Sequence, residues 1–178
     1  MPLKRASAFR RMKRAYTRKA RVKSKQYVKT IPPSRLVKYT MGNTAKYLSG
    51  GYPFVLKMIS KDSLQVRDVA IESARKQIHH AIEEHIGNDY YFEVSLYPHQ
   101  ILREHAQAAV AQADRIFQGM SLSFGKCVSL AAQVKEGNTI FIVAVMTKEL
   151  AQKARKVLKD AKQKLPVRIE IIDISPKQ

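Results

Sequence analysis

Apolar residues recur at helical spacing between residues 62 and 86. Spacings of three and four residues place one side of such a helix against a protein core. The members of this apolar face are Val66, Val69, Ala70, Ala74, Ile78, Ala81, Ile82 and Ile86. Asp62 or Ser63 can cap the first turn, and Gly87-Asn88 supplies a stop signal at the other end. The pattern therefore predicts a long amphipathic helix that begins just after these capping residues.

A second helical pattern begins after Thr147, which is a good capping residue, and ends at Pro166. Its apolar stripe consists of Leu150, Ala151, Ala154, Val157, Leu158, Ala161 and Leu165. Its other face carries Lys153, Arg155, Lys156, Lys159, Lys162 and Lys164. This basic face is either a solvated surface or a binding surface for a polyanion.

Alternating or short apolar runs predict about six strands. They lie around residues 36–39, 54–59, 90–97, 128–134, 139–145 and 167–171. The fourth and fifth runs are joined by Glu136-Gly137-Asn138, which is typical of a hairpin turn, so we predict that these two strands pair with each other. Residues 105–125 fit no single pattern, since Gly119 and Gly125 bracket a serine-rich stretch.

These elements predict an α+β fold, a two-layer α/β sandwich of a mostly antiparallel sheet and two main helices. Residues 31–178 are expected to form a single globular domain. Residues 1–30 show no apolar period, so we expect a basic, extended N-terminal arm that has little of its own to pack and orders against its partner.

Charge divides the chain unevenly. The first acidic residue is Asp62, and residues 1–61 carry 17 Lys and Arg, whereas the rest of the chain has 16 basic and 14 acidic side chains. A block of like charge repels itself unless a polyanion neutralises it, and lysine and arginine bind nucleic acids by displacing counterions from phosphates. We expect phosphate contacts from Lys4, Arg5, Arg10, Arg11, Lys13, Arg14, Arg18, Lys19, Arg21, Lys23 and Lys25.

Candidate catalytic and metal-binding patterns are weak. The lone Cys127 excludes a zinc site with several cysteine ligands, and none of the five histidines forms a chelating i,i+4 pair. No phosphate-binding glycine loop and no nucleophile elbow occurs. We therefore expect no enzyme, no cofactor, no metal and no small-molecule substrate. No stretch approaches the roughly 20 apolar residues of a membrane span, so we expect a soluble intracellular protein with no membrane partner.

One stretch of the chain resembles a known family. It reads Tyr97-Pro98-His99-Gln100-Ile101-Leu102-Arg103-Glu104, and is followed by Ala113-Asp114-Arg115, Gly119-Met120 and Phe124-Gly125-Lys126. The order and spacing of these motifs resemble the archaeal and eukaryotic type of large-ribosomal-subunit protein called L-ten-e, the counterpart of bacterial L-sixteen. The resemblance extends over most of the chain, from the basic N-terminus to Leu165-Pro166.

This resemblance implies a structural component of the large subunit in the cytoplasmic ribosome, with rRNA and neighbouring ribosomal proteins as partners. Members of the family lie beside the path of aminoacyl-tRNA into the peptidyl-transferase centre. The basic arm would then contact rRNA, and an internal loop at about residues 105–126 would point toward tRNA, a transient partner. Within this loop, residues Gly119–Lys126 are expected to be mobile in the free protein. The residues carried over to this tRNA-site loop are Arg103, His105, Arg115, Gly119, Met120, Phe124, Gly125 and Lys126, with Asp114 beside them.

The chain departs from the family pattern at Gln112, Ser121 and Cys127, where glycine, arginine and proline are common. His105-Ala106 stands where an Asn-Lys pair often follows the Arg-Glu step. The loop is therefore less positively charged than is usual for the family.

Two other classes of function fit a basic arm. An RNA-processing enzyme with a docking arm would need a catalytic constellation, which the histidine, cysteine and acidic residues do not supply. A chromatin-like protein that compacts DNA would favour a compact dimer, whereas an arm joined to a globule suits threading between folded RNA helices.

Overall fold

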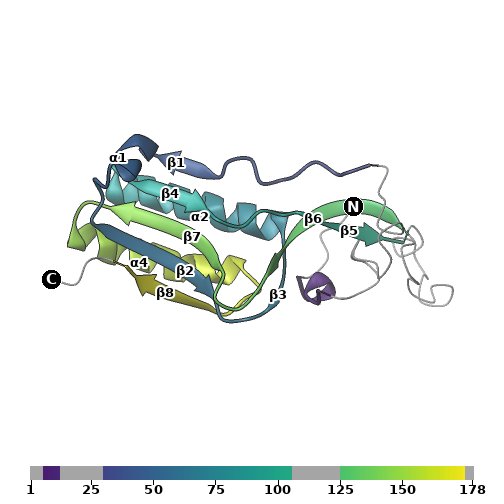
Figure 1. Cartoon of the computed structure of the whole chain (residues 1–178). Coiled ribbons are helices and arrows are strands. Elements are labelled where there is room, and N and C mark those ends of the chain that lie inside the picture. Colours follow the sequence, from purple (N-terminus) through teal and green to yellow (C-terminus); the bar gives the residue numbers. More distant parts are fainter. Residues whose placement is uncertain (1–5, 13–29, 106–124, 175–178) are drawn as a thin grey trace.

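The computed structural model describes residues 6–12, 30–105 and 125–174 (Figure 1). The strands are β1 (Thr40–Gly42), β2 (Phe54–Ser60), β3 (Leu64–Arg67), β4 (Tyr91–Val94), β5 (Gln100–Glu104), β6 (Lys126–Val134), β7 (Thr139–Val145) and β8 (Ile169–Asp173). The helices are η1 (Ala6–Phe9), α1 (Thr44–Leu48), α2 (Asp68–Ile86), α4 (Lys148–Ala161) and η4 (Lys162–Lys164), of which η1 and η4 are 3-10 turns. None of the described helices combines the length and apolar character needed to cross a membrane.

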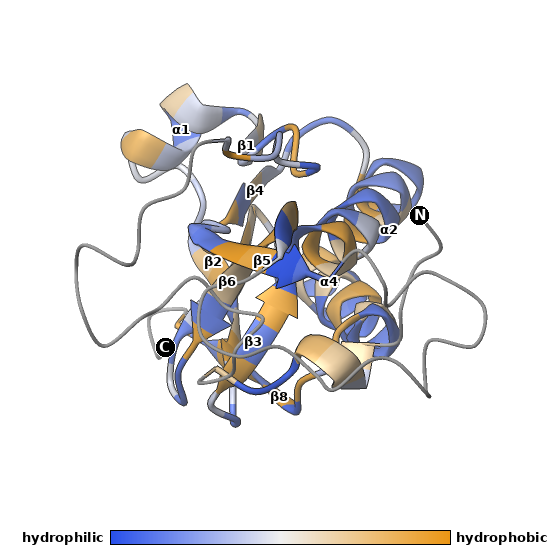
Figure 2. Cartoon of the chain, turned by 90° about the vertical axis from the view of Figure 1, so that its right-hand side faces the viewer, coloured by the Kyte–Doolittle hydropathy of each residue, from blue (hydrophilic) through white to orange (hydrophobic). Residues whose placement is uncertain are grey.

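The described strands form two antiparallel sheets. One has the order β1-β4-β7-β2-β8, and the other has the order β3-β6-β5. Helices α2 and α4 lie together on one side, with their hydrophobic faces toward the strands (Figures 1 and 2). The predicted α+β fold, with helices packed on a mostly antiparallel sheet, is confirmed.

The core lies between this helix pair and the larger sheet. Alternate residues of the central strands are fully buried there, such as Met58 on β2, Phe92 on β4 and Phe141 on β7. The ring centres of Phe92 and Phe141 are 5.6 Å apart. From the helices, the fully buried apolar residues are Ile71, Ala74, Ile78, Ile82, Ala154, Leu158 and Ala161. This area carries most of the hydrophobic stabilisation, since burial of apolar surface is the main favourable contribution to folding.

Helix α2 begins later than its sequence pattern predicts. Residues 64–67 form strand β3 instead, and Leu64 lies opposite Val134 of β6. The predicted caps do not serve the helix; Asp68 at its first position accepts a hydrogen bond from the Val69 amide at 2.8 Å. Pairing with β6 buries Val66 in a sheet, which a periodic pattern read along one segment cannot reveal. The end of the helix is as predicted, with Gly87 at φ +85°.

The predicted hairpin between the runs at 128–134 and 139–145 is wrong. Both strands exist, as β6 and β7, but β6 pairs with β3 and β5, whereas β7 pairs with β2 and β4. The turn between them therefore carries the chain from one sheet to the other. The Gly137 amide donates to the Ser60 carbonyl, 2.8 Å away, and the Ser60 amide donates to the Asn138 carbonyl at 3.0 Å. This turn is thus bonded to the end of β2, where the chain makes another crossing between the sheets.

The second helix and the last strand are close to expectation. Thr147 caps α4, and its hydroxyl accepts a hydrogen bond from the Leu150 amide at 3.4 Å. Residues 36–39 do not form the strand that was predicted there, and β1 begins just after them at Thr40. The structure also adds β3, β5 and α1, which the patterns did not predict. These elements are short, and each strand among them is defined by its partner strand rather than by its own alternation.

Candidate nucleic-acid interface

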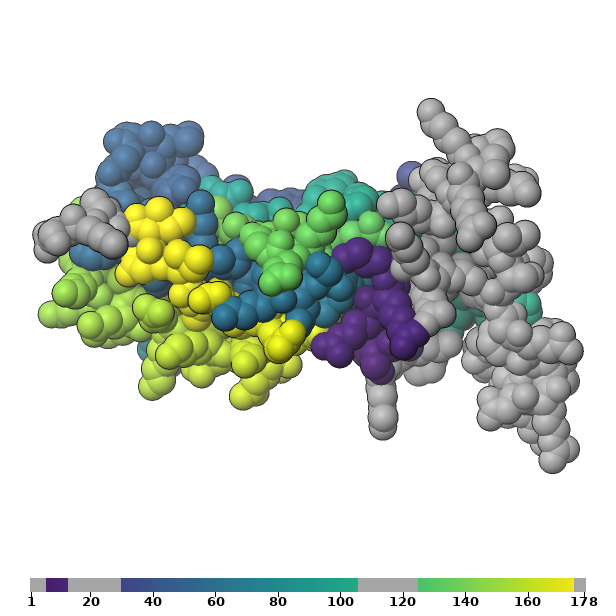
Figure 3. Space-filling view, turned by 60° about the horizontal axis from the view of Figure 1, so that its bottom comes forward, coloured from purple at the N-terminus to yellow at the C-terminus, as the bar shows by residue number. Residues whose placement is uncertain are grey.

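Residues 6–12 of the basic extension lie against the outer edge of strand β3. After the single turn η1, the Arg10 carbonyl accepts a hydrogen bond from the Gln65 amide at 2.9 Å. The Gln65 side-chain amide donates to the Phe9 carbonyl at 3.0 Å. The Arg67 guanidinium lies 5.4 Å from the centre of the Phe9 ring, a cation–π distance. In Figure 3 these purple residues lie on the surface near β3. This part of the extension therefore has packing partners within the protein, which the sequence pattern did not predict.

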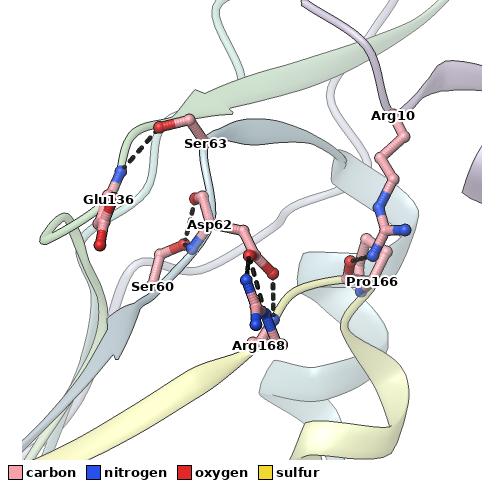
Figure 4. A network of polar contacts seen from close by, with 7 residues as sticks. All are labelled: Arg10, Ser60, Asp62, Ser63, Glu136, Pro166 and Arg168. Atoms are coloured by element: carbon pink, nitrogen blue, oxygen red, sulfur yellow. Dashed lines mark hydrogen bonds and ion pairs between the residues drawn. The ribbon is translucent and has the colours of Figure 1, made fainter.

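Beside the docked segment, Asp62 and Arg168 form an ion pair in which two guanidinium N–H groups donate to one carboxylate oxygen (Figure 4). The Arg168 Nε and Nη2 atoms lie 2.9 and 2.6 Å from Asp62 Oδ1, and the Arg168 backbone amide donates to Oδ2 at 2.9 Å. The Ser60 hydroxyl accepts from the Asp62 amide at 3.2 Å, which fixes the turn that carries the carboxylate. Asp62 thus joins the turn after β2 to the start of β8 rather than capping a helix.

These contacts hold the pKa of the Asp62 carboxyl below its ordinary value. The largest cause is the hydrogen bond from the Arg168 side chain, followed by the one from its backbone amide, and the positive charge of Arg10 acts in the same direction. Hydrogen bonds to the ionised form and nearby opposite charge both favour that form.

Replacement of Asp62 by asparagine is expected to lower the unfolding midpoint at neutral pH. Because the folded-state pKa is depressed, the stabilisation from the ionised carboxyl is fully present above its ordinary value of 3.8 and is lost as pH falls through the folded-state value. The gap in midpoint between wild type and Asp62→Asn should therefore narrow below about pH 4. Thermal unfolding followed by circular dichroism from pH 7 to pH 3 measures this, with Asp160→Asn on α4 as a control. A gap that stays constant over this range would contradict the assignment.

The docked segment and the pair border a hollow of about 460 Å³ that opens to the surface. Its lining consists of Arg10, Arg11, Asp62, Ser63, Leu64 and Arg168. The guanidinium of Arg10 bonds to the Pro166 carbonyl, 2.6 Å from Nη2, on the chain segment that leads into β8. Three guanidinium groups and one carboxylate give this hollow a net positive charge.

The basic face of α4 and η4 is exposed, as the sequence pattern indicates. Its exposed cations are Lys148, Lys153, Arg155, Lys156, Lys159, Lys162 and Lys164. In the described part of the chain, none of the salt bridges involves these residues. Arg155 donates to the Ile171 carbonyl at 3.4 Å. Since Pro166 follows η4 closely and binds Arg10, the basic face of α4 leads toward the hollow.

Strands β5 and β6 hold the two ends of the predicted tRNA-site loop at residues 105–126. Glu104 lies opposite Lys126, and Arg103 lies opposite Cys127. Arg103 is buried, and this burial lowers its pKa from the ordinary value. His105 is half-buried, and Gly125 has φ +112°, which favours glycine. Lys126 is exposed at the start of β6.

Many of the predicted contact residues lie outside the described residues. In the arm these are Lys4, Arg5, Lys13, Arg14, Arg18, Lys19, Arg21, Lys23 and Lys25. In the loop they are Arg115, Gly119, Met120 and Phe124, together with Asp114 and the atypical Gln112 and Ser121. We expect residues 119–126 to be mobile in the free protein. Of these, Gly125 and Lys126 belong to the described residues and the others do not.

Sequence patterns did not identify Asp62 and Arg168 as members of a site. Arg168 stands between the apolar Val167 and Ile169, so alternation marks it as outward-facing, but its partner lies 106 positions earlier.

Chemically, the described surface offers guanidinium and ammonium groups, which suit phosphate. Within the described ranges, no group of three or more His, Cys, Asp or Glu could hold a metal ion.

Comparison with known proteins supplies the family. The chain matches the family described as ribosomal protein L16p/L10e over residues 11–172. It is 36% identical over 174 residues to large ribosomal subunit protein uL16 of Methanococcus aeolicus, covering 97% of this chain and 94% of that protein. The protein of the same name from Methanococcus maripaludis is 38% identical with the same coverage. That of Metallosphaera sedula is 34% identical over 181 residues, covering 100% of this chain and 98% of the relative. The chain therefore belongs to the ribosomal protein L16p/L10e family, of the type found in archaea.

Proposed function

We propose that this protein is a structural constituent of the large ribosomal subunit, that it binds rRNA, and that it resides in the cytoplasmic ribosome. The observation that carries the proposal is the near-full-length similarity to archaeal proteins named large ribosomal subunit protein uL16. The similarity extends over arm and globule alike, so it does not rest on one shared motif.

The distribution of charge supports rRNA as the partner. Of the formal net charge of +19, almost all lies before Asp62, and the basic face of α4 adds exposed cations on the globule. Such contacts with phosphates provide affinity and position, and they do not require reading of base sequence. The role is structural rather than catalytic, with neighbouring ribosomal proteins as further partners and with no cofactor or small-molecule substrate.

Sedimentation of cell extract through a sucrose gradient tests this function. The protein is expected to migrate with the large subunit at low monovalent salt and to remain there at moderate salt, because many phosphate contacts act together. An antibody against the chain, or a C-terminal tag, would follow it across the fractions. Recovery in the light fractions, or with DNA, would contradict the proposal and favour the enzyme or chromatin alternatives.

We further propose that the loop at residues 105–126 lies near aminoacyl-tRNA in the assembled subunit. Its support is the match to the family motif from Arg103 to Lys126, together with the β5–β6 pairing. This pairing brings the two ends of the loop to one end of the molecule (Figure 1). A photo-crosslinking amino acid at Met120 in assembled ribosomes tests the position. Crosslinks to bound tRNA are expected, with the same amino acid at Lys153 on α4 as a control, and crosslinks to rRNA alone would contradict the proposal.

A further inference from the structure

The hollow beside β3 is assembled from three segments that are distant in the sequence. Arg10 and Arg11 come from the docked extension, Asp62 and Ser63 from the turn between β2 and β3, and Arg168 from the approach to β8. The hydrogen bonds of Gln65 fix the first segment, and the bonds between Asp62 and Arg168 join the other two. The arrangement therefore exists only in the folded protein.

The Arg168 side chain is 77% exposed, yet both of its bonds to Asp62 fix the plane of its guanidinium. An exposed arginine normally loses considerable rotamer freedom when it binds a ligand. Here the Asp62 carboxylate has already ordered the group, so less entropy remains to be lost on binding.

The guanidinium of Arg10 is also held by a hydrogen bond within the protein. The Pro166 carbonyl bonds to Nη2, and within the described part of the chain this is the acceptor that its guanidinium uses. Among the described residues its other N–H groups have no acceptor, so they can donate to an incoming oxygen. Arg10 is also close enough to Asp62 to influence the ionisation of the carboxyl, so the two guanidinium groups border the same space.

We propose that this hollow is a preformed seat for a backbone phosphate of RNA, gripped by Arg10 and Arg168 together. The inference rests on the proposed function, because it assigns one place where rRNA meets the globule. A phosphodiester has two unbridged oxygens that accept charge-assisted hydrogen bonds, and arginine matches their geometry better than lysine. Since the exposed cations of α4 and η4 lead toward Pro166, the seat connects the basic arm with the basic helix face in one RNA-binding surface.

The test uses the full-length chain and purified large-subunit rRNA from the same source, with affinity measured by filter binding over a range of salt. The variants are Arg10→Gln, Arg168→Gln and the double variant, and the control is Arg35→Gln, an exposed arginine on the segment before β1. Each of the two seat variants is expected to lower affinity roughly three- to tenfold and to reduce the log–log salt slope by about 0.7 to 0.9. The control should change both quantities less.

The double variant separates a shared phosphate from a general field of charge. If both arginines grip one phosphate, their effects are coupled, and the loss in the double variant is smaller than the product of the single losses. Independent contributions to a diffuse field would multiply. Losses of affinity that multiply in the double variant would contradict the proposal that both arginines bind one phosphate. Single variants that lose no more affinity than Arg35→Gln would contradict it as well.

Two further readouts keep the outcomes distinct. The unfolding midpoints of all variants are compared first. The variants Arg10→Lys and Arg168→Lys are then added, because lysine keeps the positive charge but lacks the planar guanidinium group. If the seat binds phosphate through the arginine geometry, the lysine variants bind RNA more tightly than the glutamine variants but more weakly than the wild type. Lysine variants with the affinity of the wild type would contradict a site that requires arginine. Failure of the wild-type protein to bind rRNA would contradict the proposed function. If the wild type binds and the seat variants have the same affinity as Arg35→Gln, only the proposed phosphate seat is contradicted.

Discussion

Removal of residues 1–30 is expected to weaken binding to large-subunit rRNA by roughly 10³-fold or more at about 0.05 M salt. The segment carries 12 Lys and Arg and no acidic residue. Each phosphate contact contributes about 0.7 to 0.9 to the log–log salt slope, so the loss of ten contacts would reduce the slope by about 7 to 9. Filter binding of the deletion variant and the full chain to the same rRNA, from 0.05 to 0.3 M salt, measures both quantities.

The structure adds a second consequence of the same deletion. Residues 6–12 contribute two hydrogen bonds and a cation–π contact to β3, so their loss is expected to cost about 1 to 3 kcal/mol of unfolding free energy. The globule should remain folded, because its apolar core lies between the larger sheet and the helices.

A charge-neutralised arm is the matched control for this deletion. It keeps residues 1–12 and replaces the basic residues Lys13, Arg14, Arg18, Lys19, Arg21, Lys23, Lys25 and Lys29 by glutamine. This variant should lose most of the RNA affinity while it retains the unfolding midpoint of the wild type. RNA affinity that survives both changes would contradict the arm as the main phosphate-binding element.

Truncation of Phe141 to alanine is expected to cost about 3 to 5 kcal/mol of unfolding free energy. The side chain is fully buried on β7, the strand that pairs with both β4 and β2, and its ring packs against Phe92. Alanine would leave a cavity that the surrounding strands can fill only in part, and this loss is a large fraction of the total stability of a typical domain. Urea unfolding monitored by circular dichroism gives the free energy.

Two variants calibrate the measurement on Phe141. Phe141→Leu keeps an apolar side chain in the cavity and should cost clearly less than alanine. Val37→Ala, at a position that is 73% exposed, should change the free energy by no more than about 0.5 kcal/mol. A loss below about 1 kcal/mol for Phe141→Ala would show that this ring does not fill the centre of the core.

The position of the core residues could be predicted from the sequence to a large extent. Ala74, Ile78 and Ile82 stand on the predicted face of α2, and Leu158 and Ala161 stand on the predicted face of α4. Helical periodicity succeeds here because each helix buries one continuous stripe, and that stripe is a local property of the segment.

Strand pairing could not be predicted in the same way. Residues 128–134 and 139–145 are joined by a turn that is typical of a hairpin, and yet β6 and β7 belong to different sheets. An alternating strand can pair with any other strand that offers a matching apolar face, so the choice depends on distant partners. The same reason explains why residues 64–67 form a strand although the segment continues a helical pattern.

An α+β protein with an asymmetric positive charge could be predicted from the sequence alone, and the sequence motifs indicated the ribosomal family. These properties depend on composition, local periodicity and the order of short motifs. The meeting of Arg10, Asp62 and Arg168 depends on the folded structure, since their contacts join positions that are far apart along the chain. The same holds for the docking of residues 6–12 on β3, because hydrogen bonds between backbone groups leave no mark in the pattern of side chains.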